Sequence, residues 1–133
     1  MKKVLAAVVV LVVVTVWVVA CGGSAGGGGG NAGGGSSTDV HMGQTNFTPS
    51  SMTISKGSRI NLINDTAVTH IIANGRWENN TAQPGAEPGA PTVNNLQFTT
   101  ANQSQTIGPF TTAGTFHLYC IVHPGMNLTV TVQ

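Results

Sequence analysis

The chain has 133 residues and a mass of 13.6 kDa, which is too short for two hydrophobic cores of ordinary size, so we expect one folded domain. Charged residues are only 7% of the total, and beyond residue 35 three Lys and Arg side chains stand against four Asp and Glu, a net charge of −1. Because three scattered cations cannot neutralise a phosphate backbone, the composition excludes nucleic acid as a partner.

The first 20 residues predict a segment for export rather than part of the fold. Lys2 and Lys3 precede an apolar run that ends at Ala20, just before Cys21. This pattern resembles the signal peptide and lipobox of bacterial lipoproteins. The resemblance implies cleavage before Cys21 and a lipid on its thiol that anchors the protein to the outer face of the cytoplasmic membrane, on the periplasmic or extracellular side. The alternative is an uncleaved transmembrane anchor, since residues 4–20 just reach spanning length.

Residues 21–37 predict a linker between the lipidated Cys21 and the domain. Ten of the eighteen glycines lie in residues 22–35, among Ser, Ala and Asn only. Such a composition offers no apolar surface to offset the entropy of ordering, so we expect a flexible tether. The folding unit is then residues 38–133.

The folding unit has the sequence pattern of an all-β domain. Its apolar residues come in short alternating runs rich in Val, Ile, Thr and Phe, separated by turn residues. The spacing predicts a sandwich or a small barrel. Eight strands are expected, at 39–47, 51–55, 58–64, 69–74, 96–100, 103–107, 115–120 and 126–132.

Residues 75–95 are rich in Pro, Gly and Asn and predict one long connection, in which Trp77 is a packing anchor. In the strand that ends at Cys120, alternation places Phe116, Leu118 and Cys120 on the buried face and Tyr119 on the outer face. With Cys21 carrying lipid, Cys120 has no partner for a disulfide, which is unusual in an exported protein.

The segment after this strand carries the chemistry. Cys120, His123 and Met126 are spaced Cys-x2-His-x2-Met on a loop between two strands, so that a thiolate, an imidazole and a thioether can face one ion. A second histidine would give the His2Cys set with a weak axial Met that is typical of blue-copper electron transfer. His70, at the start of a predicted strand, is the best candidate. Zinc also suits a Cys/His site, but the Met donor favours copper.

These residues resemble a cupredoxin of the plastocyanin and amicyanin type. The similarity is strongest over 105–132, which includes the ligand loop, moderate over 45–72, and weak over 73–104. It implies a Greek-key β-sandwich of about eight strands that holds one copper ion in a type 1 site. Carried over by residue, His70, Cys120 and His123 would be the equatorial ligands and Met126 the axial ligand. Ile71 departs from the family, which often has Asn there to brace the ligand loop.

The resemblance also implies the activity. The protein would carry single electrons, as Cu(II) and Cu(I), between redox proteins on the outer side of the membrane, and would not be an enzyme or transform a small-molecule substrate. Partners would dock transiently on the apolar rim near His123, which would serve as the electron exit. Tyr119, next to Cys120 but expected to point outward, is a possible second exit.

Two other functions stay open at this point. The same ligands could bind copper for storage or delivery without electron transfer, or the spacing could be accidental in a structural β-sandwich lipoprotein. The two remaining histidines are poorer ligand candidates. His41 begins the first predicted strand, and His117 lies on the strand face opposite Cys120.

Overall fold

The computed structural model describes residues 37–133, and every regular element in this range is a β-strand. The predicted lipoprotein signal, Cys21 and most of the expected linker lie outside the described residues. Among the described residues there is no helix with the length and hydropathy needed to cross a membrane. The ten strands are β1 (Ser37–Met42), β2 (Phe47–Thr48), β3 (Ser51–Ile54), β4 (Arg59–Asn64), β5 (His70–Glu78), β6 (Thr81–Pro84), β7 (Leu96–Phe98), β8 (Ser104–Ile107), β9 (Gly114–Cys120) and β10 (Asn127–Val132).

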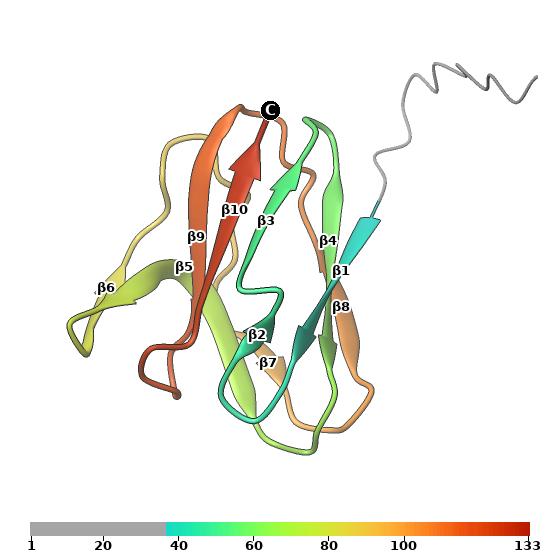
Figure 1. Ribbon diagram of the computed structural model, residues 1–133, viewed down its shortest axis with the longest axis vertical. Coiled ribbons are helices and arrows are strands. Elements are labelled where there is room, and N and C mark those ends of the chain that lie inside the picture. The colour runs from blue at the N-terminus through green and yellow to red at the C-terminus, as the bar shows by residue number, and fades with distance from the viewer. Residues whose placement is uncertain (1–36) are drawn as a thin grey trace, which may run out of the picture. The chain divides into compact units, whose positions relative to one another are not determined.

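The strands form two sheets that face one another as a Greek-key sandwich (Figure 1). One sheet has the order β2-β1-β4-β8, and the other has the order β3-β10-β9-β5-β6 with β7 also paired to β5. The chain passes repeatedly from one sheet to the other, so β1 pairs with β4, and β3 with β10, in parallel. The all-β sandwich predicted from the alternating runs is confirmed.

The core lies between the two sheets and follows the period of two that the sequence predicts. Every second residue of β4 and of β10 is buried. The domain therefore has a hydrophobic core of its own, the property that lets a domain fold independently. The fully buried apolar side chains include Val40, Met42, Ile60, Leu62, Ile72, Phe98, Leu128 and Val130.

The first predicted strand, 39–47, is wrong in its extent. β1 ends at Met42, and the chain turns back through residues 43–46, where the amide of Gly43 donates to the carbonyl of Asn46 at 3.0 Å. The short strand β2 then pairs antiparallel with the end of β1. The sequence Gly43-Gln-Thr-Asn46 favours a turn over a straight strand, and this turn places the Gly43 carbonyl at the end of the sandwich.

The long connection expected at 75–95 is also partly wrong. β5 continues to Glu78 and pairs with β6 in a hairpin whose turn residues, Asn79 and Asn80, have positive φ of 49° and 59°. Asn tolerates this left-handed conformation, which a two-residue hairpin turn requires. The connection is therefore residues 85–95, and the hairpin extends away from the main sheet (Figure 1).

Candidate metal centre

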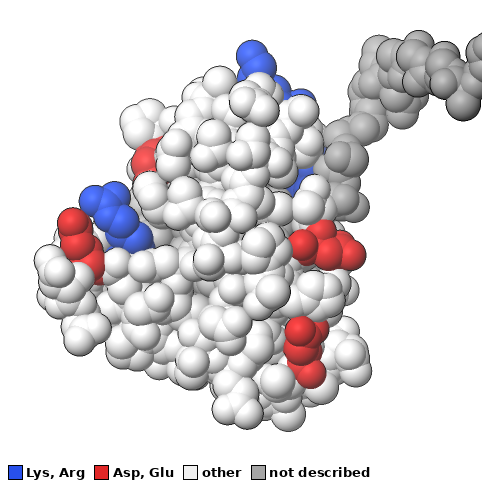
Figure 2. Space-filling view, viewed as in Figure 1, with Lys and Arg blue, Asp and Glu red and all other residues white. Residues whose placement is uncertain are grey.

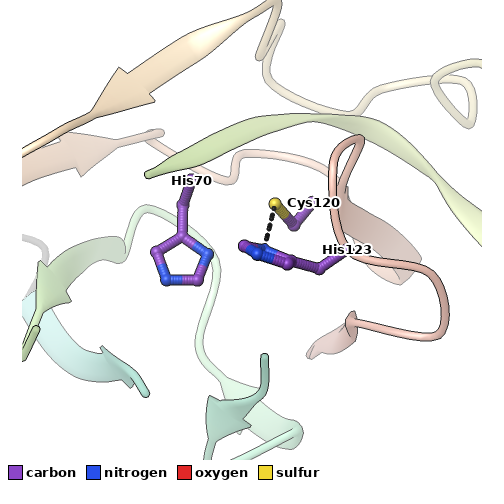
Figure 3. A group of neighbouring side chains, drawn as sticks. All are labelled: His70, Cys120 and His123. Atoms are coloured by element: carbon purple, nitrogen blue, oxygen red, sulfur yellow. Dashed lines mark hydrogen bonds between the residues drawn. The ribbon is translucent and has the colours of Figure 1, made fainter. Parts of the chain in front are cut away.

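Three chemically active side chains from two neighbouring strands and one loop lie together at one end of the sandwich (Figure 3). His70 opens β5, Cys120 closes β9, and His123 lies in the loop to β10. β5 and β9 are adjacent, with Ile72 opposite Cys120 in the register. The donor atoms of the three residues all lie within 4.8 Å of one another, close to the span that a single metal ion bridges.

The ring of His70 is fixed with one nitrogen free. Nε2 lies 2.9 Å from the carbonyl oxygen of Gly43, and because a carbonyl only accepts, Nε2 carries the proton. Nδ1 is buried without any hydrogen-bond partner. Burial lowers the pKa of His70, which favours the neutral form of the ring. A neutral imidazole with a fixed tautomer and an unpartnered, buried lone pair is what a metal ligand needs.

Cys120 and His123 face each other across the loop. The thiol is fully buried, and Sγ lies 3.3 Å from Nδ1 of the partly exposed His123. The ring centroids of His70 and His123 are 4.8 Å apart. The two imidazoles and the thiol thus approach a common point from different elements.

Met126 closes the loop. Its side chain is buried, its amide donates to the carbonyl of His123 at 3.1 Å, and its carbonyl accepts from the amide of Cys120 at 3.0 Å. The chain therefore returns to its starting point within seven residues, Cys120 to Met126, which keeps Met126 beside the other candidates.

The other two histidines have separate partners. Nδ1 of His41 is 2.7 Å from a carboxylate oxygen of Asp65, and Nδ1 of His117 is 2.5 Å from a carboxylate oxygen of Glu87. Neither belongs to the group of His70, Cys120 and His123. Their exclusion from the predicted ligand set agrees with these contacts.

Comparison with known families decides the cofactor. The sequence model for copper binding proteins of the plastocyanin/azurin family matches residues 35–133. This chain belongs to that family. Its cofactor is copper, and His70, Cys120, His123 and Met126 are arranged as a type 1 copper site.

Solved structures give the same fold. Amicyanin from Paracoccus versutus is 20% identical, with 73% of this chain and 81% of that chain covered, and a TM-score of 0.55. The reduced forms of two amicyanin variants give TM-scores of 0.52 at 19% and 18% identity, covering 73% and 77% of this chain and 82% and 87% of theirs. No curated protein gives a significant match.

The cupredoxin resemblance led us to expect no side-chain support for the ligand loop at Ile71, whose side chain has no polar group. The backbone supplies one contact instead, because the carbonyl of Ile71 accepts from the amide of Ile121 at 2.9 Å. Side-chain hydrogen bonds to the ligand loop must therefore come from residues other than Ile71.

The predicted exposure of Tyr119 is wrong. The residue lies on the face of β9 that points away from the core, as alternation predicts, but it is only 4% exposed. The hairpin of β5 and β6 covers it, with the rings of Trp77 and Tyr119 in an edge contact at 5.9 Å. Tyr119 therefore lacks the exposed surface on which its proposed role as a second electron exit depended.

Sequence reasoning missed one set of contacts at this site. Trp77 packs as predicted, but its indole also donates to the carbonyl of Cys120 at 2.8 Å, and its backbone is bonded to the side chain of Asn127. The pair Asn79-Asn80 is a sequence signal for the two-residue hairpin turn that follows Trp77, but nothing in the sequence indicates the contact with Cys120.

Proposed function

We propose that the protein is a membrane-tethered blue copper protein that carries single electrons between redox proteins on the outer side of the cytoplasmic membrane. The observation that supports it best is the donor set, in which His70 keeps an unpartnered, buried Nδ1 close to the thiol of Cys120 and the ring of His123. We assign His70, Cys120 and His123 as equatorial ligands and Met126 as the axial ligand.

Bound copper would supply a one-electron couple between Cu(II) and Cu(I). The protein's part is to hold the donors in nearly the same place in both states. The Gly43 carbonyl fixes the ring of His70, and the paired hydrogen bonds between Cys120 and His123–Met126 fix the loop. Preorganised donors of this kind need little rearrangement when the charge changes.

The exit for electrons is proposed at His123. It is the partly exposed member of the three, whereas His70 and Cys120 are fully buried. Its neighbour Val122 is 45% exposed and is the one exposed large hydrophobic side chain among residues 38–133. With the exposed Pro124, it forms an apolar rim, residues 122–125, suited to transient docking.

Charge does not favour a different docking face. The described domain has three Lys and Arg and four Asp and Glu side chains, and Arg76 pairs with Glu78 at 3.4 Å. On the face in Figure 2 no large patch of one sign is formed. Electrostatic steering therefore contributes little, and a neutral rim is expected to recognise partners weakly and release them quickly.

The tether is proposed to be a lipid on Cys21, followed by the glycine-rich linker. The end of the domain at which the described chain begins suits an exit at His123. Ser37 enters β1 opposite Arg59, whereas Met42 at the other end of β1 lies opposite Asn64 and adjoins the Gly43 turn that holds His70. The chain thus enters the domain at the end remote from the ligand loop (Figure 1), which leaves His123 accessible to partners.

Two measurements distinguish electron transfer from copper delivery, namely the rate of one-electron cycling and the rate of copper release. For a carrier we expect fast, reversible one-electron cycling of the copper-loaded domain on an electrode, with slow release of copper to a strong chelator. Rapid loss of copper without reversible cycling would instead indicate delivery, and would contradict the proposal. We propose no enzymatic role.

The docking rim can be tested by the electron self-exchange rate between the Cu(I) and Cu(II) forms, measured from nuclear magnetic resonance line widths. Val122→Glu should slow the exchange about ten-fold, because a carboxylate must be desolvated when two rims meet. Thr81→Glu, on the exposed β6, is the matched control and should leave the rate unchanged. Equal rates for the parent and both variants would place the exit elsewhere.

A further inference from the structure

We infer that Trp77 is a positioning residue of the copper site, in which its indole N–H holds the carbonyl of Cys120 and thereby sets the reduction potential. This inference rests on the proposed copper ligation by Cys120. The observation that supports it is a contact between two residues that are far apart in the chain. Trp77 lies 43 residues before Cys120 in the chain and outside the paired part of β5 and β9, which ends at Asn74.

Three hydrogen bonds join Trp77 to the two flanks of the ligand loop. The indole Nε1 donates to the carbonyl of Cys120 at 2.8 Å, before the loop. After the loop, the side chain of Asn127 accepts from the amide of Trp77 at 2.7 Å and donates to its carbonyl at 3.0 Å. A single residue of the hairpin therefore connects both ends of the segment that carries Cys120, His123 and Met126.

The Cys120 carbonyl has few other contacts. Within the loop it accepts only the amide of His123, at a long 3.4 Å, so the indole is its stronger partner. The Ile71 side chain cannot contribute a hydrogen bond to the loop. The indole thus provides polar support that comes from outside the loop, as metal ligands normally require.

The fold brings Trp77 there through Gly75. This residue has a φ of +128°, and a Cβ on it would lie 2.3 Å from the carbonyl oxygen of Gln83 and 2.9 Å from the ring of Tyr119. Only glycine permits both the conformation and the close approach. The bend at Gly75 directs β5 out of the main sheet and over Tyr119, where the indole reaches Cys120.

The hydrogen bond from the Trp77 indole should shift the reduction potential of the copper site in one direction. The indole N–H directs the positive end of its dipole toward the backbone of the thiolate ligand. Cu(I) has one positive charge fewer than Cu(II), so a positive dipole end near the site favours the reduced state. Trp77 should therefore raise the reduction potential. Because its hydrogen bonds also restrain the ligand loop, Trp77 should strengthen copper binding as well.

The test compares Trp77→Phe, which keeps an aromatic ring beside Tyr119 but removes the N–H donor, with Thr81→Ala in the same hairpin as a control. In the copper-loaded domain, Trp77→Phe should keep the blue absorption, lower the reduction potential and weaken copper binding about ten-fold. Thr81→Ala should match the parent. A potential for Trp77→Phe equal to that of the parent would overturn the inference, while absence of the blue site in the parent would instead contradict the proposed function.

A second measurement needs no metal. Because the thiol of Cys120 is buried, in the copper-free domain it should react with an aromatic disulfide reagent only when the loop opens. Removal of the indole donor should increase this rate about ten-fold, as expected for the loss of one hydrogen bond to a buried carbonyl. An unchanged rate would show that the indole does not restrain the loop.

Discussion

Each nitrogen of His70 has a different role, and this separation explains why His70 is suited to copper whereas His41 and His117 are not. Nε2 is bonded to the Gly43 carbonyl and Nδ1 is buried without a partner, which costs free energy in the absence of a ligand. In His41 and His117, by contrast, a ring nitrogen is bonded to a carboxylate. At the scale of the residue, the free lone pair distinguishes a ligand from a histidine in an ion pair.

His41 provides a prediction at this scale. The hydrogen bond from its ring to Asp65 raises the pKa of His41 above 6.5, and the charge of the same carboxylate adds to the effect. The pair therefore stabilises the fold fully below pH 6.5 and loses its contribution as the pH rises through the folded pKa. In the Cu(I) form of the domain, a pH titration of the His41 ring protons by nuclear magnetic resonance should give a midpoint above pH 6.5. In the Asp65→Asn variant this midpoint should be lower. The same midpoint in both proteins would contradict the assignment.

At the scale of the element, the hairpin of β5 and β6 and the connection after it cover part of the outer face of the sheet that contains β9. Beyond Trp77, Asn74 fixes the connection, since its side chain accepts from the amide of Val93 at 2.6 Å and donates to the carbonyl of Pro91 at 3.2 Å. Glu87 accepts from the backbone amide of His117 at 3.2 Å and bonds to its ring. These contacts form a layer over the outer face of β9, which buries Tyr119 and leaves His117 half-buried.

Gly75→Ala should disrupt this layer. The new Cβ would meet backbone atoms of Gln83 and Pro84 at a positive φ, so we expect a loss of about 3 kcal/mol or more in the free energy of unfolding, measured by urea denaturation. Gly85→Ala is the matched control. Gly85 also has a positive φ, of 147°, but open space around it, so only about 1 kcal/mol should be lost. Similar losses for the two variants would mean that the close approach at Gly75 contributes nothing.

Ionisation of Glu87 should make the stability of the fold depend on pH. Burial raises the pKa of Glu87, but the hydrogen bonds from the ring and backbone of His117 outweigh it, and the net pKa lies below 4.5. A carboxylate with a lowered pKa stabilises the fold above pH 4.5 and loses that contribution as the pH falls through the folded value. Since both side chains are about a quarter exposed, we expect Glu87→Gln to cost only about 1 kcal/mol at pH 7.

The measurement is the difference in unfolding free energy between the parent and Glu87→Gln as the pH is lowered. It should shrink towards zero well below pH 4.5, where Glu87 is protonated in the parent. A difference that stays constant down to pH 2 would exclude the ionised carboxylate as its origin.

At the scale of the whole molecule, the features that depend on residues close together in the chain could be predicted from the sequence. The contacts between distant segments could not. Cys120, His123 and Met126 lie within seven residues of one another, so the ligand loop could be identified from the sequence. The alternation of apolar and polar residues predicted most of the strands. Whether Tyr119 is exposed depends on a hairpin more than 30 residues away, which alternation within β9 cannot indicate. The support of Cys120 by Trp77 could not be predicted for the same reason.

Titration of the domain, residues 36–133, with Cu(II), followed by visible absorption and electron paramagnetic resonance, tests the copper site most directly. The ligand set predicts an intense thiolate-to-copper band and a narrow copper hyperfine splitting at one equivalent, both lost in Cys120→Ser. A colourless complex, or an ordinary tetragonal copper spectrum that persists in Cys120→Ser, would contradict the type 1 site and the electron-carrier function built on it.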